Sequence, residues 1–314
     1  MQILRSTAHS YELITDWGIP PEKQSFKESA AVAVDAKDNV WVFNIPTNQL
    51  LIFNSDGNLL NIWPHKYENI HGIDFDSSGN VYLVNRNDHQ VLKYTINGDL
   101  IMSLGQSGLP SETGYSLQIG RDTNWKNPVS HAGGPFNVPS GVRIAQNGDI
   151  YVSDGYANCQ IHRFSMDGKL IYSWGSPGKT KASEFHLIHG LYIDSKNRIL
   201  VCDRMNNRIQ VFDLMGNFIG AYSGLSMPSK VHETPDGDFV ITEHTGRISI
   251  IDIEGNFLSR WGNADGTINT PGSGIFPKPH GCAVDSKGNI YIGSVIANNT
   301  SLGSGERIVK IVKI

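Results

Sequence analysis

The chain of 314 residues has few cysteines, no long apolar run and no concentration of basic residues. Its three cysteines lie far apart in the sequence without the close spacing of a thiolate metal site, so we interpret them as free thiols: Cys159, Cys202 and Cys282. No segment approaches the roughly 20 apolar residues that a membrane-spanning helix requires, which argues against a membrane protein. The net charge of −4, with no basic run, argues against nucleic acid as a partner.

Two further patterns are missing. No window shows sustained 3.6-residue apolar periodicity, so helices are expected to be minor. The first residues, Met1 to Tyr11, contain no apolar signal-peptide core, and together with the free cysteines this predicts a cytoplasmic location. What the chain has instead is glycine, with 33 residues concentrated between short apolar runs rich in Val, Ile and aromatic residues. This composition is typical of short strands joined by tight turns.

One unit recurs six times along the chain. It consists of a strand, an Asp-x-x-Gly-Asn turn, a second strand, a turn, a third strand, an Asp-Gly turn and a fourth strand. In the six copies the first strand with the start of its turn spans Val32–Asp35, Ile73–Asp76, Val142–Gly148, Leu191–Asp194, Val231–Gly237 and Cys282–Asp285. A period of roughly 40 to 50 residues with four short strands is typical of a propeller blade. The sequence therefore predicts an all-β fold, a six-bladed β-propeller that forms one domain over residues 1–314.

The two ends of the chain predict how the ring closes. Residues Glu12–Gly18 match the outer strands Leu170–Pro177 and Phe257–Gly262, although no blade precedes them. Residues Arg307–Ile314 have the pattern of a third strand that no fourth strand follows. Pairing of the two ends would complete the last blade and remove two open sheet edges.

Three histidines stand at equivalent places in this repeat. His71, His189 and His280 each precede a glycine at the start of the first strand, in copies two, four and six. The same place in the other copies holds Ala30, Ser140 and Ser229. We expect the histidines to lie in the loop that leads into the strand, at one mouth of the central channel. In a ring of blades this spacing surrounds one axis with three imidazoles, whose neutral nitrogen ligands favour Zn²⁺ with a fourth position open. The alternative is that each histidine is hydrogen-bonded in the channel wall.

A second ring of positions lies at the end of the second strand and faces the same mouth. Its members are Ile45, Arg86, Gly155, Arg204, His244 and Ser294. Arg86, Arg204 and His244 would clamp an anionic or carbonyl substrate, and the alternative is that the arginines are ordinary surface residues of turns. The neighbouring Asp154 and Asp203 are expected to fix their turns through hydrogen bonds to the backbone.

Residues 107–136 form the longest segment outside the repeat. The segment is polar, contains glycine and proline, and connects the second copy to the third. Long loops inside compact domains commonly carry function, so we predict a lid over the channel mouth. His131 in this segment would contact substrate as a lid residue, or would simply be solvated.

The blade motifs as a whole resemble NHL repeats, and three parts together resemble the peptidyl-α-hydroxyglycine α-amidating lyase family. These parts are Val152-Ser-Asp-Gly-Tyr-Ala-Asn-Cys-Gln-Ile161, Val201-Cys-Asp-Arg-Met-Asn-Asn-Arg-Ile-Gln-Val-Phe212 and the three His-Gly pairs. The resemblance covers roughly residues 25 to 314. It implies a zinc ion held by His71, His189 and His280, with Tyr156 as catalytic base and Arg204 beside the metal.

The chain departs from the family pattern at two places. The family's second active-site arginine lies in the first blade, where this chain has Ile45, and Arg86 in the adjacent blade could reach a similar volume. The family's aspartate that is associated with a structural calcium corresponds to Gly281, so a structural calcium is doubtful here. The implied reaction cleaves the N–C bond of a carbinolamide, in a small-molecule or peptide-like substrate, and gives an amide and an aldehyde such as glyoxylate.

Two other classes of function stay open. One is a metal-dependent hydrolase or lactonase on the same propeller, which would act through a metal-bound hydroxide. The other is a non-catalytic NHL propeller that binds a protein or peptide. Metal content separates this scaffold from the enzymes, and consumption of water separates the hydrolase from the lyase.

Overall fold

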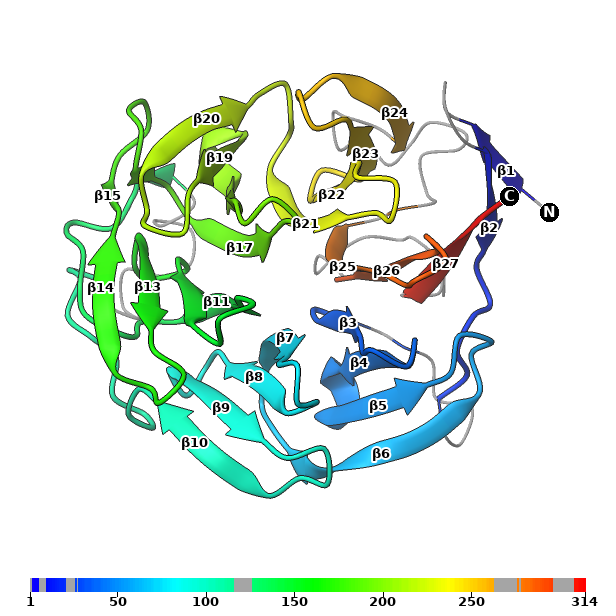
Figure 1. Ribbon diagram of the computed structural model, residues 1–314, viewed down its shortest axis with the longest axis horizontal. Helices are drawn as coiled ribbons and strands as arrows, with labels where there is room; N and C mark the ends of the chain where they lie inside the picture. The colour runs from blue at the N-terminus through cyan, green and yellow to red at the C-terminus, as the bar shows by residue number, and fades with distance from the viewer. Residues whose placement is uncertain are drawn as a thin grey trace. The chain divides into compact units, whose positions relative to one another are not determined.

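The computed structural model describes residues 2–5, 10–20, 26, 28–115, 126–262, 276, 278–295 and 308–314. Arg307 of the predicted last strand and residues 116–125 of the segment 107–136 lie outside the described residues. The described residues form six blades, each a sheet of four or five strands, which confirms the predicted six-bladed β-propeller (Figure 1). Within these ranges, no helix has the length and apolar character needed to cross a membrane.

Five blades are four-stranded sheets whose strands follow one another along the chain. Blade 1 comprises β3 (Val32–Val34), β4 (Val40–Asn44), β5 (Gln49–Phe53) and β6 (Leu59–Lys66). Blade 2 comprises β7 (Ile70–Phe75), β8 (Val81–Asn85), β9 (Gln90–Tyr94) and β10 (Leu100–Leu104). Blade 3 comprises β11 (Pro139–Ile144), β12 (Ile150–Asp154), β13 (Gln160–Phe164) and β14 (Leu170–Trp174). Blade 4 comprises β17 (Ile188–Ile193), β18 (Ile199–Asp203), β19 (Arg208–Phe212) and β20 (Phe218–Tyr222). Blade 5 comprises β21 (Pro228–Glu233), β22 (Phe239–Glu243), β23 (Arg247–Ile251) and β24 (Phe257–Gly262).

Blade 6 joins the two ends of the chain. Its strands are β25 (Pro279–Val284), β26 (Ile290–Ser294), β27 (Ile308–Lys313), β2 (Ser10–Ile14) and β1 (Gln2–Arg5). Leu13 of β2 lies opposite Ile311 of β27, which confirms the predicted closure. The predicted bounds of the N-terminal strand, Glu12–Gly18, were wrong at both ends, because β2 runs from Ser10 to Ile14. The blade also has five strands and not the four predicted, because β1 pairs with β2. Beyond Ile14 the chain leaves the sheet, and Trp17 is buried in the core while its Nε1 donates to Ser55 O at 2.9 Å.

The blades belong to two compact units. Residues 1–67 with 229–314 contain blades 1, 5 and 6, and residues 68–228 contain blades 2, 3 and 4. In the second unit β11 contacts β7 and β17, and these first strands lie on the inner side while β10, β14 and β20 lie outside (Figure 1). In the first unit β25 contacts β3 and β22. A short parallel pair, β15 (Ser176–Pro177) with β16 (Glu184–Phe185), precedes blade 4.

Apolar side chains of neighbouring blades form the core within each unit. In the second unit, Tyr82 and Val84 of blade 2 pack with Val142 and Val152 of blade 3. All four side chains alternate along their strands with residues of the opposite face, as the two-residue period of a strand requires. The core therefore lies between the blades, which makes the inner strands rigid supports for side chains on the inner side. The three cysteines are free and buried, as predicted.

The Asp-x-x-Gly-Asn turn owes its recurrence to one set of hydrogen bonds. Asp76 Oδ1 accepts from the backbone N of Ser78 and of Asn80, both at 3.0 Å, and Asn80 Nδ2 donates to Asp76 Oδ2 at 2.9 Å. Gly79 has φ of +81°, a conformation that glycine adopts without strain. The same carboxylate contacts recur at Asp35 and Asp285.

Candidate active site

The three histidines each occupy a β-bulge. In blade 2, Ile70 and Gly72 pair with consecutive residues of β8, so His71 between them is the extra residue. The same shift occurs at His189 in β17 and at His280 in β25. Our prediction of a loop position was therefore wrong, because each histidine is the second residue of its strand. A bulge re-aims the side chain of the extra residue away from the alternation of the strand.

The glycine has a packing role after two of the three bulges. A Cβ atom at Gly72 would lie 2.9 Å from Val84 Cγ2 and 3.1 Å from Gly141 Cα of the next blade. A Cβ atom at Gly281 would lie 3.1 Å from Val32 Cγ2. The His-Gly pair thus combines a site residue with a close approach between first strands, and Gly281 is explained by packing.

Hydrogen bonds of the Nδ1 atoms define the imidazole tautomer. His71 Nδ1 lies 2.6 Å from Ser140 O, and His280 Nδ1 lies 3.0 Å from Ala30 O. Ser140 and Ala30 hold the place equivalent to the histidines in the next blade of the same unit. Because a carbonyl oxygen only accepts, Nδ1 carries the proton of the neutral ring and Nε2 carries the lone pair. A backbone partner on one ring nitrogen commonly orients the other toward a metal.

Tyr156 lies between the two histidines of the second unit. Its hydroxyl oxygen is 3.0 Å from His71 Nε2 and 2.7 Å from His189 Nε2. The two imidazole ring centroids are 4.7 Å apart, and the ligand nitrogens lie within 4.8 Å of each other. A phenol has one proton and can donate to only one of two Nε2 lone pairs.

A cation shared by both nitrogens would relieve this conflict, so the donor set of His71 and His189 fits a metal ion. His280 occupies the same bulge position in blade 6 of the first unit and has the same Nδ1 contact as His71. The three residues are thus of a type and number that could hold a metal ion.

Two arginines flank Tyr156. Arg86 directly follows β8, and its guanidinium carbon lies 3.9 Å from the Tyr156 ring centroid. Arg204 begins the 3-10 helix η4 (Arg204–Asn206) and is 1% exposed. Burial lowers the pKa of Arg204 to about 10, the charge of Arg86 acts in the same direction, and the contact with Tyr156 opposes the shift. The structure therefore brings Arg86 and Arg204 together with Tyr156, as a positive environment suited to an anion.

Three further members of the second ring lie in the first unit, and Gly155 lies in the second unit directly before Tyr156. His244 follows β22, and its ring centroid is 6.2 Å from that of His280. Ile45 begins the 3-10 helix η2 (Ile45–Thr47) and is partly exposed. Ser294 is buried at the end of β26. Of these three, His244 is the residue that the structure places beside a candidate ligand.

The two carboxylates at the ends of second strands have structural contacts. Asn137 N donates to Asp154, and His186 N donates to Asp203 Oδ1 at 2.9 Å. The expected backbone hydrogen bonds are present, but they reach the segment before the first strand and not the turn that follows the second. The sequence prediction missed this connection because Asn137 and His186 belong to no repeated motif.

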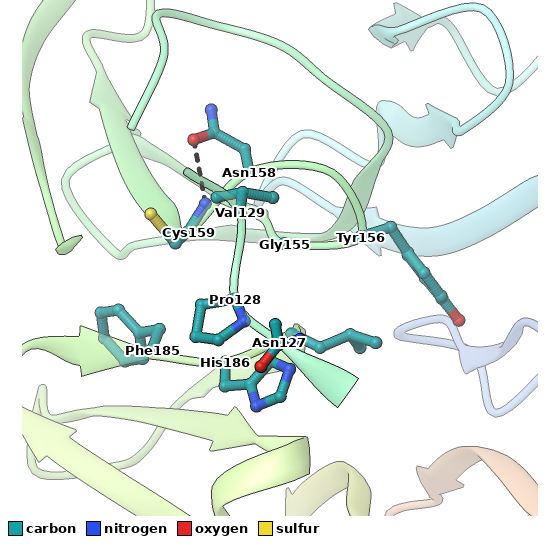
Figure 2. Close-up of a pocket in the computed structure, with 10 residues that line it drawn as sticks. Asn127, Pro128, Val129, Gly155, Tyr156, Asn158, Cys159, Phe185 and His186 are labelled. Atoms are coloured by element: carbon teal, nitrogen blue, oxygen red, sulfur yellow. Dashed lines mark hydrogen bonds between the residues drawn. The ribbon is translucent and has the colours of Figure 1, made fainter. Parts of the chain in front are cut away.

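The described part of the segment 107–136 lies against Tyr156. Asn127, Pro128 and Val129 line a small cavity together with Gly155, Tyr156, Asn158, Cys159, Phe185, His186 and Leu187 (Figure 2). Its volume of about 10 Å³ has room for about one water molecule. The Tyr156 side chain extends away from Pro128 and Phe185 in Figure 2. His131 Nε2 lies 2.6 Å from Glu112 Oε2, and both side chains are exposed, which favours the solvated alternative for His131.

Comparison with known proteins gives the same fold and two kinds of relative. A family model described as a 6-bladed beta-propeller matches residues 135–261. Human NHL repeat-containing protein 3 is 31% identical over 257 residues, which cover 75% of this chain and 68% of that protein. Peptidyl-alpha-hydroxyglycine alpha-amidating lyase 1 of Drosophila melanogaster is 29% identical over 244 residues, 71% of this chain and 42% of that protein. A solved gluconolactonase of Xanthomonas campestris has the same fold, with a TM-score of 0.62, 14% identity, and coverage of 97% of this chain and 90% of that one.

Proposed function

The chain belongs to the NHL repeat family that includes NHL repeat-containing protein 3. We propose that it is a zinc-dependent lyase. Its substrate class would be a carbinolamide, cleaved at the N–C bond to an amide and an aldehyde such as glyoxylate. The observation that carries the proposal is the Tyr156 hydroxyl, which lies within hydrogen-bond distance of Nε2 of both His71 and His189. Relatives named as amidating lyases support it.

His71, His189 and His280 would hold the metal through Nε2, since the Nδ1 protons of His71 and His280 are committed to backbone carbonyls. Equivalent positions in alternate blades of a six-bladed ring support this ligand set. A zinc ion with an open fourth position supplies a Lewis acid for a hydroxyl or carboxylate oxygen of the substrate.

Tyr156 would act as base and then as acid. Its phenolate takes the proton of the carbinol hydroxyl, the carbon–oxygen bond becomes a carbonyl, and the bond to the amide nitrogen breaks. The departing nitrogen carries the electron pair and receives the proton back from the Tyr156 phenol. No water is consumed, and the products are an amide and an aldehyde.

The two arginines would orient the substrate. Arg204, buried beside Tyr156, provides a planar guanidinium for a carboxylate or for the developing oxygen charge. Arg86 covers one face of the Tyr156 ring and would bind the far end of the substrate, a task we also assign to His244.

The test is a product analysis in ¹⁸O-labelled water with an N-acyl-α-hydroxyglycine as substrate. A lyase releases primary amide without the label, together with an equal amount of aldehyde, at a rate above the spontaneous reaction. A hydrolase acting at the acyl group instead yields a labelled carboxylic acid, and this product would replace the lyase assignment. A zinc-containing chain that releases no aldehyde would favour the hydrolase, whereas a purified chain without stoichiometric zinc would favour the binding scaffold.

Arg204 also gives a prediction about stability. Its folded-state pKa lies below that of the unfolded chain, so its charge disfavours folding at neutral pH, and this penalty fades above about pH 10. We therefore expect Arg204→Met to abolish aldehyde release and to raise the free energy of unfolding by about 1–4 kcal/mol at pH 7. Urea denaturation measures this.

Arg208 is the matched control for that substitution. Its Nε donates to the buried Asp203 Oδ2 at 2.8 Å, so Arg208→Met leaves a buried carboxylate without its cation. We expect Arg208→Met to lower the free energy of unfolding by about 3–5 kcal/mol. If Arg204→Met destabilises the protein as strongly as Arg208→Met, Arg204 is a structural residue.

A further inference from the structure

A buried carboxylate stands two residues before Tyr156. Asp154, at the end of β12, is 0% exposed. It accepts hydrogen bonds from Asn137 N at 3.0 and 2.9 Å, from Asn158 Nδ2 at 2.8 Å and from His162 Nε2 at 3.3 Å. A carboxylate in this environment requires such partners, because an unsatisfied buried charge is costly. The four contacts therefore fix the geometry of the chain around residue 154.

Blade 3 supports its carboxylate differently from blade 4. The residue that faces Asp203 across the ladder is Arg208, which bonds to it at 2.8 Å. The residue that faces Asp154 is Gln160. His162, two residues after Gln160, contacts Asp154 through Nε2, and its Nδ1 lies 2.7 Å from Ser173 Oγ. Blade 3 thus places a histidine where blade 4 uses an arginine.

The same network ties the segment 107–136 to the turn that carries Tyr156. Asn158 Nδ2 lies 3.2 Å from Gly133 O, and Gly133 N donates back to Asn158 Oδ1 at 3.1 Å. Thr113 Oγ1, which is fully buried, donates to Ala157 O at 2.6 Å. Both described arms of the segment are therefore bonded to residues 157 and 158, directly after Tyr156.

One backbone hydrogen bond of Tyr156 is long. Its N lies 3.4 Å from Val138 O, which is at the long end for a backbone hydrogen bond. The side-chain contacts of Asp154 and Asn158 on either side of Tyr156 add to this bond in holding the turn. The phenol oxygen needs this precision, because it must reach two Nε2 atoms at once, and a displacement of about 1 Å in an active site can cost on the order of 100-fold in rate.

We infer that Asp154 is a positioning residue for Tyr156, which holds the Tyr156 turn together with residues 107–115 and 126–136 through His162, Asn158 and Asn137. This inference rests on the proposed function for its catalytic consequence. It assigns to these two described arms of the segment the role of a fixed wall beside Tyr156, joined to the same carboxylate that orients the base.

The first test is kinetic. Asp154→Asn keeps the size of the side chain and removes its charge, and we expect kcat to fall about 10- to 100-fold with little change in KM, as for other groups that orient a site residue. His162→Gln copies Gln210 of blade 4, whose Nε2 donates to Asp203 at 3.1 Å, and should keep kcat near that of the wild type. His162→Leu removes the donor, so its kcat should fall by about as much as in Asp154→Asn.

Asp194→Asn is the matched structural control. Asp194 is also buried, and it accepts from the backbone N of Lys196 at 3.0 Å and of Arg198 at 2.7 Å in the inner turn of blade 4. Both Asp→Asn variants should lose stability, and only Asp154→Asn should lose kcat. An unchanged kcat in Asp154→Asn, or equal losses in both variants, would overturn the inference.

The second test does not need activity. Amide hydrogen exchange is measured for residues 154–159 and 108–115. In Asp154→Asn both stretches should exchange faster together, while Asp194→Asn should leave them unchanged. Wild-type exchange rates in Asp154→Asn contradict the inference whether or not the chain is a lyase. If both stretches exchange faster in Asp154→Asn but the wild-type protein releases no aldehyde, only the proposed function is contradicted.

Discussion

His189→Ala is expected to lose its zinc and all measurable aldehyde release while the propeller stays folded. The substitution leaves two imidazoles, and three protein ligands are the usual minimum for a catalytic zinc site. The fold should persist because its cores lie between blades and contain no histidine. Zinc per chain, measured by elemental analysis, and a cooperative melting curve check the two halves of this prediction.

His162→Gln serves as the control for that experiment. His162 is as buried as His189, but its ring nitrogens contact Ser173 and Asp154 and stand away from the repeated His-Gly position. The control protein should keep one zinc per chain. Full zinc occupancy in His189→Ala would rule out the proposed ligand set.

Tyr156→Phe is expected to lower turnover by roughly 10²–10⁴-fold and to keep the zinc, because a missing general base typically costs this much. The variant retains the ring that Arg86 covers and removes only the hydroxyl that reaches His71 and His189. Steady-state rates of aldehyde release at saturating substrate measure the effect.

Tyr172→Phe removes a comparable hydroxyl elsewhere in the same blade. The Tyr172 hydroxyl donates to Leu214 O at 2.8 Å on the outer side of the unit, so its loss should leave turnover near the wild-type rate. Equal turnover in Tyr156→Phe and the wild type would make Tyr156 a packing residue and would remove the proposed base.

The sequence was sufficient to predict the fold because the information repeats. Each blade carries a tight turn between its first two strands, and in blades 2 and 6 this turn is Asp-x-x-Gly-Asn, with the local roles seen at Asp76 and Gly79. Closure of blade 6 was predictable because the first strand matched the outer strands of complete blades. The extra strand β1 and the early end of β2 were not, because Gln2–Arg5 is short and strand length depends on the partner strand.

The candidate site was only partly predictable. Alignment of the repeats identified His71, His189 and His280, but the bulges that hold them depend on register with the second strand, which no single segment encodes. The place of Tyr156 came from the family resemblance, and its contact with Arg86 joins two different blades. The network of Asp154 was invisible because Thr113, Asn137 and His162 meet only in the folded chain and follow no common spacing.

Anomalous diffraction at the zinc absorption edge, on crystals grown without added metal, tests the central claim most directly. The account predicts one peak per chain at about 2.0–2.1 Å from Nε2 of His71, His189 and His280. Crystals without a zinc peak, or with the peak away from these three nitrogens, would contradict it.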